Sequence, residues 1–153
     1  MNAYRFLFIV GMILFLIGCS PNTDSSQSGP NNGVNFTNIS TKGSLDQSIS
    51  NNAKQSLSQH KEITTINAVN TEKILVIAFE VHHNKRFQLA KLRKKMHKKL
   101  EKVFPDQKVE LSTDKKIVIE TNRLENKIRQ GDISKKNLKK EVKHLIKLMN
   151  EQT

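Results

Sequence analysis

The only cysteine of the chain, Cys19, has the surroundings that most clearly specify a chemistry. It directly follows Leu16, Ile17 and Gly18, which close an apolar run. A short hydrophobic stretch, a small residue and then a cysteine form the lipobox that bacterial lipoprotein processing recognises. We expect the thiol to receive a diacylglyceryl group through a thioether bond. We also expect residues 1–18 to be removed, so that the acylated cysteine becomes the new amino terminus.

The physical character of the first 18 residues supports that expectation. Arg5 and the free amine make the start of the chain positive, and the apolar run that follows is about 12 residues long, which fits a signal peptide. A transmembrane helix would need roughly 20 such residues. An ordinary secretory signal with an incidental cysteine is the alternative, but Cys19 has no intramolecular disulfide partner. The sequence therefore predicts a lipid-anchored, extracytoplasmic protein at the cell membrane.

Residues 19–44 differ in composition from the rest of the chain. Ser, Asn, Gly, Thr and Pro dominate, and the large apolar residues are limited to Val34, Phe36 and Ile39. Such a segment buries too little apolar surface to offset its loss of conformational entropy, so we predict a flexible tether. Residues 45–150 are enough for one small hydrophobic core and too few for two domains.

The hydrophobic pattern of residues 45–150 predicts a single α+β domain. Apolar residues recur every three or four positions in the expected helices, and β-branched residues cluster in the expected strands. The predicted order is helix-strand-strand-helix-strand-strand followed by C-terminal helices, with a sheet of about four strands. The expected bounds are a helix over 45–57, strands over 63–69 and 74–79, a helix over 86–104, strands over 108–111 and 116–121, a short helical stretch around 124–128, and a last helix over 134–149.

Two local features refine this prediction. The nearly continuous apolar run over residues 74–79 is typical of a central strand that is covered on both faces. The sequence of residues 71–74 resembles that of residues 113–117, and each follows an expected helix. This resemblance leaves open a duplication of two similar halves, with chance as the alternative.

The positive charge lies almost entirely in the second half of the chain. Up to residue 81, five basic residues balance five acidic ones, whereas residues 82–153 hold 21 Lys and Arg against nine Asp and Glu, which accounts for the whole net charge of +12. Six lysines fall on each of two expected helices. A tethered domain would hold them near anionic head groups, where each cation contributes on the order of 1 kcal/mol. The lysines predicted to contact an anionic lipid, an anionic wall polymer or an acidic partner are Lys91, Lys94, Lys95, Lys98, Lys99, Lys102, Lys136, Lys140 and Lys143.

A solvated surface is the alternative explanation for these lysines, and nucleic acid is the other anionic partner to consider. Single-stranded nucleic acid binding favours exposed aromatic residues among the cations. We expect Phe87 and Phe104 to lie in the core or at its edge, and export would separate the protein from cytoplasmic DNA. The sequence therefore predicts no nucleic-acid partner.

The polar residues do not form a recognisable catalytic or metal-binding motif. A nucleophile elbow, a Ser/Lys pair, a His-Glu-x-x-His helix and a phosphate-binding glycine loop are all absent from the sequence. His82 and His83 are neighbours at a strand end, where their side chains would point to opposite faces. Glu80 and Glu120 would both lie at strand ends and are expected to face solvent or pair with lysine. We predict no catalytic residue, no metal, no cofactor and no enzymatic activity.

The lipobox, the tether and the basic domain together resemble the sporulation lipoproteins of the YhcN/YlaJ family. Residues 64–87 carry most of the likeness: residues 66–73 lead into the strand at 74–79, and Lys85, Arg86 and Phe87 open a basic helix. The resemblance implies a spore-membrane lipoprotein with a binding or structural role in germination or outgrowth, and a germination protein as a partner. It supplies no catalytic residue. A module that recognises anionic lipid or wall polymer directly is the alternative, and the oligomeric state stays open.

Overall fold

The computed structural model of the chain describes residues 33–39 and 45–151. The predicted signal peptide, Cys19 with its lipobox and the first part of the predicted tether lie outside those ranges. Within them, every helix is too short or too polar to cross a bilayer.

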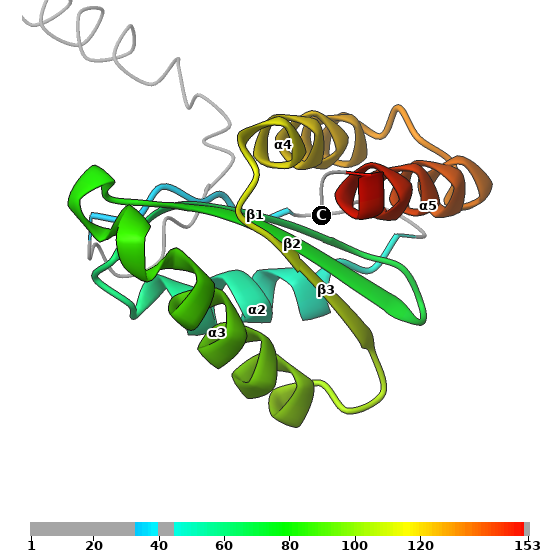
Figure 1. The fold of residues 1–153 in the computed structure, drawn as a ribbon. Coiled ribbons are helices and arrows are strands. Elements are labelled where there is room, and N and C mark those ends of the chain that lie inside the picture. The colour runs from blue at the N-terminus through cyan, green and yellow to red at the C-terminus, as the bar shows by residue number, and fades with distance from the viewer. Residues whose placement is uncertain (1–32, 40–44, 152–153) are drawn as a thin grey trace, which may run out of the picture.

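The fold is a three-stranded sheet with helices on both faces, which confirms the predicted α+β class (Figure 1). Strand β1 pairs antiparallel with β2, and β2 pairs parallel with β3, so β2 is central. Helices α2 and α3 cover one face of the sheet, and helices α4 and α5 cover the other (Figure 1). The elements are α2 (Ser48–Ser58), β1 (Ile63–Asn70), β2 (Ile74–Val81), the 3-10 helix η1 (His83–Gln88), α3 (Leu89–Val103), β3 (Lys108–Ser112), α4 (Lys115–Gln130) and α5 (Lys135–Glu151).

The central strand β2 divides the core into two layers. Leu75, Ile77 and Phe79 pack with α2 and α3, whereas Val76 packs with α4 and α5 on the opposite side. Ala78 belongs to the same side as Val76 and contacts the first turn of α4. This alternation confirms the prediction of a central strand, because only a strand covered on both faces needs apolar residues at consecutive positions.

The predicted fourth strand at residues 116–121 is wrong, because these residues form the first turns of α4. The carboxylate of Asp114 accepts hydrogen bonds from the backbone N–H groups of Lys116 and Ile117, which is the pattern of a helix N-cap. Buried residues then recur with helical spacing along α4: Ile117, Val118, Thr121, Leu124, Glu125 and Ile128. A run of three β-branched residues over 117–119 favours a strand. The Asp114 cap and the helical spacing of the buried residues along all of α4 outweigh this local preference.

The connection between β2 and β3 excludes a duplicated pair of hairpins. Helix α3 lies between these strands in the sequence, and such a crossover brings the second strand back parallel to the first. The sheet therefore has three strands in place of the expected four, and the second half of the described chain has no hairpin.

Helix α3 confirms the predicted basic helix but begins later than expected. The chain first forms η1 and enters α3 at Leu89, with Met96 and Leu100 fully buried. Phe104 is partly buried against the first core layer, in agreement with its expected place at the core edge. Phe87 is 80% exposed, so the expectation that it joins the core is wrong. Phe87 lies five residues before Leu92 and nine before Met96, which is outside the three- and four-residue spacing of the buried stripe of α3.

Residues 33–39 were assigned to the tether from the sequence, but they pack against the fold. Asn35 forms a parallel bridge to β1: its N–H donates to the carbonyl of Thr64 at 2.7 Å, and its carbonyl accepts from Ile66 at 2.9 Å. The side chain of Asn51 bonds both the N–H and the carbonyl of Ile39. Ile39 is only 5% exposed and belongs to the second core layer.

Substitution of Ile39 tests whether this segment is part of the fold. We expect Ile39→Ala to lower the free energy of unfolding by about 2–5 kcal/mol, because it leaves a cavity in a closed layer. Urea denaturation followed by circular dichroism measures the change. The matched control is Ile119→Ala at a site that is 43% exposed, where little change is expected. Equal small losses in the two variants would show that residues 33–39 contribute nothing to stability.

Candidate functional site

The exposed side of α3 carries a continuous basic stripe. Lysine and leucine are strong helix formers, so the segment forms a helix that turns its leucines inward and its lysines outward. The stripe residues recur every three or four positions, all five are exposed, and they lie opposite the buried Met96 and Leu100. We refer to this surface as the α3 stripe: Lys91, Lys94, Lys95, Lys98 and Lys102.

The α3 stripe has no neutralising carboxylate within the described part of the chain. Other lysines do have one: Lys127 lies 3.9 Å from Glu141, and Lys147 lies 3.7 Å from Glu151. The stripe lysines form no such ion pair with any residue of the ranges 33–39 and 45–151. Their charges are therefore compensated by solvent ions, which an anionic surface can replace.

Lys99 is the predicted contact that the structure separates from the stripe. Its ammonium lies 3.3 Å from the carbonyl of Ser56 and 3.4 Å from Nε2 of His60, both at the C-terminal end of the α2 region. Partial burial, together with the positive charge of Lys99, lowers the pKa of His60. Lys99 thus faces α2 and is poorly placed to meet an external surface.

The lysines of α5 fall into two groups. Lys135 and Lys139 both bind Glu72 in the turn between β1 and β2, the latter at 2.8 Å. The hydrogen bonds that these two lysines donate to Glu72 lower the pKa of its carboxyl group to about 2. The predicted contacts on this helix are exposed and form no ion pair with another described residue: Lys136, Lys140 and Lys143.

The two basic helices lie on opposite faces of the sheet (Figure 1). A single flat surface therefore cannot contact both of them fully. The sequence pattern did not distinguish between docking by one helix and docking by both, and the layer arrangement favours one at a time.

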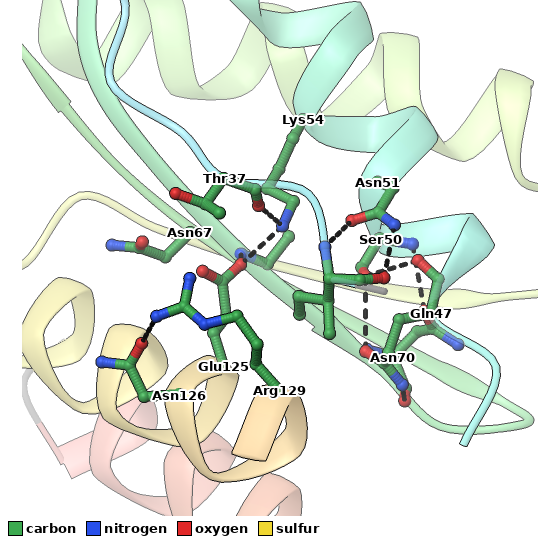
Figure 2. A network of polar contacts seen from close by, with 12 residues as sticks. Thr37, Gln47, Ser50, Asn51, Lys54, Asn67, Asn70, Glu125, Asn126 and Arg129 are labelled. Carbon is green, nitrogen blue, oxygen red and sulfur yellow. Dashed lines mark hydrogen bonds and ion pairs between the residues drawn. The ribbon is translucent and has the colours of Figure 1, made fainter. Parts of the chain in front are cut away.

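A second concentration of polar residues is buried between α2, β1 and α4 (Figure 2). The ammonium of Lys54 donates to the carbonyl of Thr37 and to Oε1 of Glu125 at 2.9 Å. The same carboxylate oxygen accepts the N–H of Ala68 at 2.8 Å. Lys54 has no exposed surface and Glu125 is 5% exposed. Burial lowers the pKa of Lys54 and raises that of Glu125, while their mutual attraction opposes both shifts.

Polar side chains also close the outer edge of β1. Oε1 of Gln47 accepts the N–H of Asn70 at 3.0 Å, and Nε2 of Gln47 donates to the carbonyl of Asn70 at 2.8 Å. The side chain of Asn70 in turn accepts the N–H of Ser50. Together with Asn35 and Glu125, these contacts satisfy backbone groups that an open edge strand would present to another chain. The chemistry of this network is therefore structural: it joins segments and covers an edge.

Neither Lys54 nor Glu125 was identified from the sequence, although a signal existed. Lys54 falls on the buried stripe of α2 with Ser50, Ala53 and Leu57, and Glu125 falls on that of α4. Opposite charges at core positions of two different helices are an indication of a buried pair, because a single buried charge is too costly.

The remaining ionisable residues are dispersed. Glu120 lies in α4, where it pairs with Arg123 at 2.7 Å, so its expected place at a strand end is wrong. His82 and His83 are exposed, and His97 bonds the carbonyl of Val109. Side chains of the metal-ligating types His, Cys, Asp and Glu nowhere gather in a group of three or more in the described ranges.

One comparison with known proteins gives a match. A family model described as sporulation lipoprotein YhcN/YlaJ matches residues 20–150. No curated protein and no solved structure is significantly similar to this chain.

A double-mutant cycle tests whether Lys54 and Glu125 act as a pair. Lys54→Met alone leaves a buried carboxylate, and Glu125→Gln alone leaves a buried ammonium, so each should lower the free energy of unfolding by about 3–5 kcal/mol. In the double variant no charge is buried, and the glutamine can still accept the N–H of Ala68. We expect it to be more stable than either single variant. Losses that simply add in urea denaturation would contradict the pairing.

Proposed function

Because the chain belongs to the YhcN/YlaJ family of sporulation lipoproteins, we propose that a lipid on Cys19 anchors it to a spore membrane, where it has a binding or structural role in germination or outgrowth. The role is non-catalytic. The family supports a membrane-anchored lipoprotein of sporulation, and the spore membrane, the anchor residue and the stage of action are the proposed refinements.

The observation that carries this proposal is the uncompensated charge of the α3 stripe. A lipid anchor would hold the domain within a short distance of a bilayer, where the anionic surface potential acts over about 8–10 Å. By contrast, the buried ionisable pair Lys54 and Glu125 holds the fold together and is closed to solvent. The accessible polar chemistry is thus that of a binding surface, and an acidic partner of the germination apparatus is a second occupant it would accept.

Replacement of the anchoring residue in the spore-forming host tests the primary function. We expect Cys19→Ala to abolish labelling of the protein by a clickable fatty acid and to release the protein from the membrane fraction of spores. Germination or outgrowth should then be slowed as much as in a strain that lacks the gene, because the protein acts only at the membrane. Normal germination of a strain that lacks the gene would refute the role, and undiminished labelling of the variant would refute the anchor.

A second candidate function is direct recognition of anionic lipid or anionic wall polymer by a basic helix, without a protein client. The exposure of five unpaired lysines on one helix face favours it. Of the two basic helices, α3 is the better candidate, since two of the lysines of α5 are already engaged by Glu72.

Replacing lysines on each helix in turn tests whether α3 or α5 binds anionic lipid. With the unlipidated chain from residue 20, the triple variant Lys94→Gln, Lys95→Gln and Lys98→Gln should bind vesicles rich in phosphatidylglycerol about a hundredfold more weakly, at roughly 1 kcal/mol per lysine. Co-sedimentation at low salt measures the binding. The matched control is the triple variant Lys136→Gln, Lys140→Gln and Lys143→Gln, which should bind nearly as the parent does. Equal binding of the parent to neutral and anionic vesicles would exclude lipid recognition.

A further inference from the structure

Phe87 is the most exposed large hydrophobic residue of the described chain. Its exposed fraction is 80%, compared with 51% for Val103 and 43% for Ile119. Single apolar residues on a surface are common and need no explanation by themselves. The position of Phe87 relative to the basic residues and to the start of the packed chain is what gives it significance.

Phe87 lies at the N-terminal end of the α3 stripe. It precedes Lys91, the first residue of the stripe, by four residues in the sequence, and Lys85 and Arg86 come immediately before it. Residues 83–100 contain eight Lys and Arg and no Asp or Glu. An exposed aromatic ring thus sits within a long stretch of purely positive charge, which is the composition of segments that lie in the interface of anionic bilayers.

The packed N-terminal segment begins at the same end of the sheet as η1. Asn35 bridges to Thr65, and Thr65 pairs with Glu80, three residues before η1 begins. Because this segment runs parallel to β1, Gly33 lies toward the end where β2 continues into η1 (Figure 1). Thirteen residues separate Cys19 from Gly33, and they can span at most roughly 50 Å. A chain anchored through Cys19 would therefore leave the fold at the end that carries Phe87, within that maximum distance of the bilayer.

We propose that Phe87 inserts into the interfacial region of an anionic membrane while the α3 stripe lies along the phospholipid head groups. This surface, η1 with α3, is where the domain rests on the bilayer, and the inference builds on the proposed lipid anchor. The occupant is a lipid surface rather than a wall polymer, because the proposed anchor would hold this end of the domain at a bilayer. The lysine stems can extend along the membrane surface with their charged ends at the phosphates.

The absence of tryptophan from the sequence makes the insertion directly measurable. Every residue of the core layers lies at or after Val34, so a chain of residues 19–153 retains the whole described fold. Its single cysteine, Cys19, can be coupled to a maleimide phospholipid in vesicles, which holds the chain at the surface in every arm of the experiment. The reporter is Phe87→Trp, and the matched control is Ile119→Trp on α4, which covers the opposite face of the sheet.

On phosphatidylglycerol vesicles we expect the emission of Trp in the Phe87→Trp chain to shift to shorter wavelength and to be quenched by brominated acyl chains. On neutral phosphatidylcholine vesicles it should stay at the wavelength of the vesicle-free chain, and the control should stay there on both. Unchanged emission of the reporter on anionic vesicles, or equal changes on neutral ones, overturns the insertion. Neither result affects the α3 stripe, because co-sedimentation of the lysine variants tests that separately.

A polar substitution supplies the second measurement. Phe87→Ser should weaken co-sedimentation of the uncoupled chain with anionic vesicles by about tenfold, as expected for loss of one buried aromatic side chain. The free energy of unfolding should not change, because the ring is exposed. Ile119→Ser is the control and should bind as the parent does. Binding of Phe87→Ser equal to that of the parent would show that the ring contributes nothing at the membrane.

Discussion

The structure depends above all on one carboxylate. Oε1 of Glu125 accepts hydrogen bonds from the ammonium of Lys54 and from the N–H of Ala68, so a single oxygen joins α4 to α2 and to β1. Lys54 extends the connection to residues 33–39 through the carbonyl of Thr37. Burial of two charges is costly unless their geometry and hydrogen bonding are nearly complete. The pair therefore stabilises the fold little relative to apolar residues, and its contribution is that it joins four segments through directional contacts.

The exact position of residues 33–39 matters because they determine where the chain leaves the fold. Strand β1 is at the edge of the sheet, and an edge strand needs a cover for its outward backbone groups. Asn35 supplies that cover near the start of β1, and Gln47 supplies it at the end. Because the cover near the start belongs to the segment predicted as tether, closing the edge also fixes how the domain would be oriented relative to the proposed anchor.

The sequence was sufficient to predict those helices and strands whose hydrophobic pattern extends over many residues. The hairpin of β1 and β2 and the helices α3 and α5 have clear periods over many residues, and all are present in the structure.

The short β-branched run at residues 117–119 was misassigned because three residues fit a strand and a helix equally, and the decisive Asp114 cap lies before it. The positions of Lys54 and Glu125 on two buried stripes could have indicated a buried pair, but not where it lies, since its members are 71 residues apart and only the packing of α2 and α4 across the edge of β1 brings them together. The expectation for Phe87 was wrong because it rested on hydrophobicity alone, whereas residue 87 lies outside the three- and four-residue spacing of the buried positions on α3.

The same residue type has two different roles on the two basic helices. On α5, Lys135 and Lys139 bind Glu72 and so fasten the helix to the turn between β1 and β2. On α3 no acidic residue of the described chain is placed to do this, and residues 83–100 contain none of their own. Since the two helices lie on opposite faces of the sheet, a surface that attracts lysine gains more from α3, which has five lysines without an ion pair to a described residue, than from the three such lysines of α5. From the distribution of a few carboxylates, rather than from the total of +12, we therefore expect one preferred side toward an anionic surface.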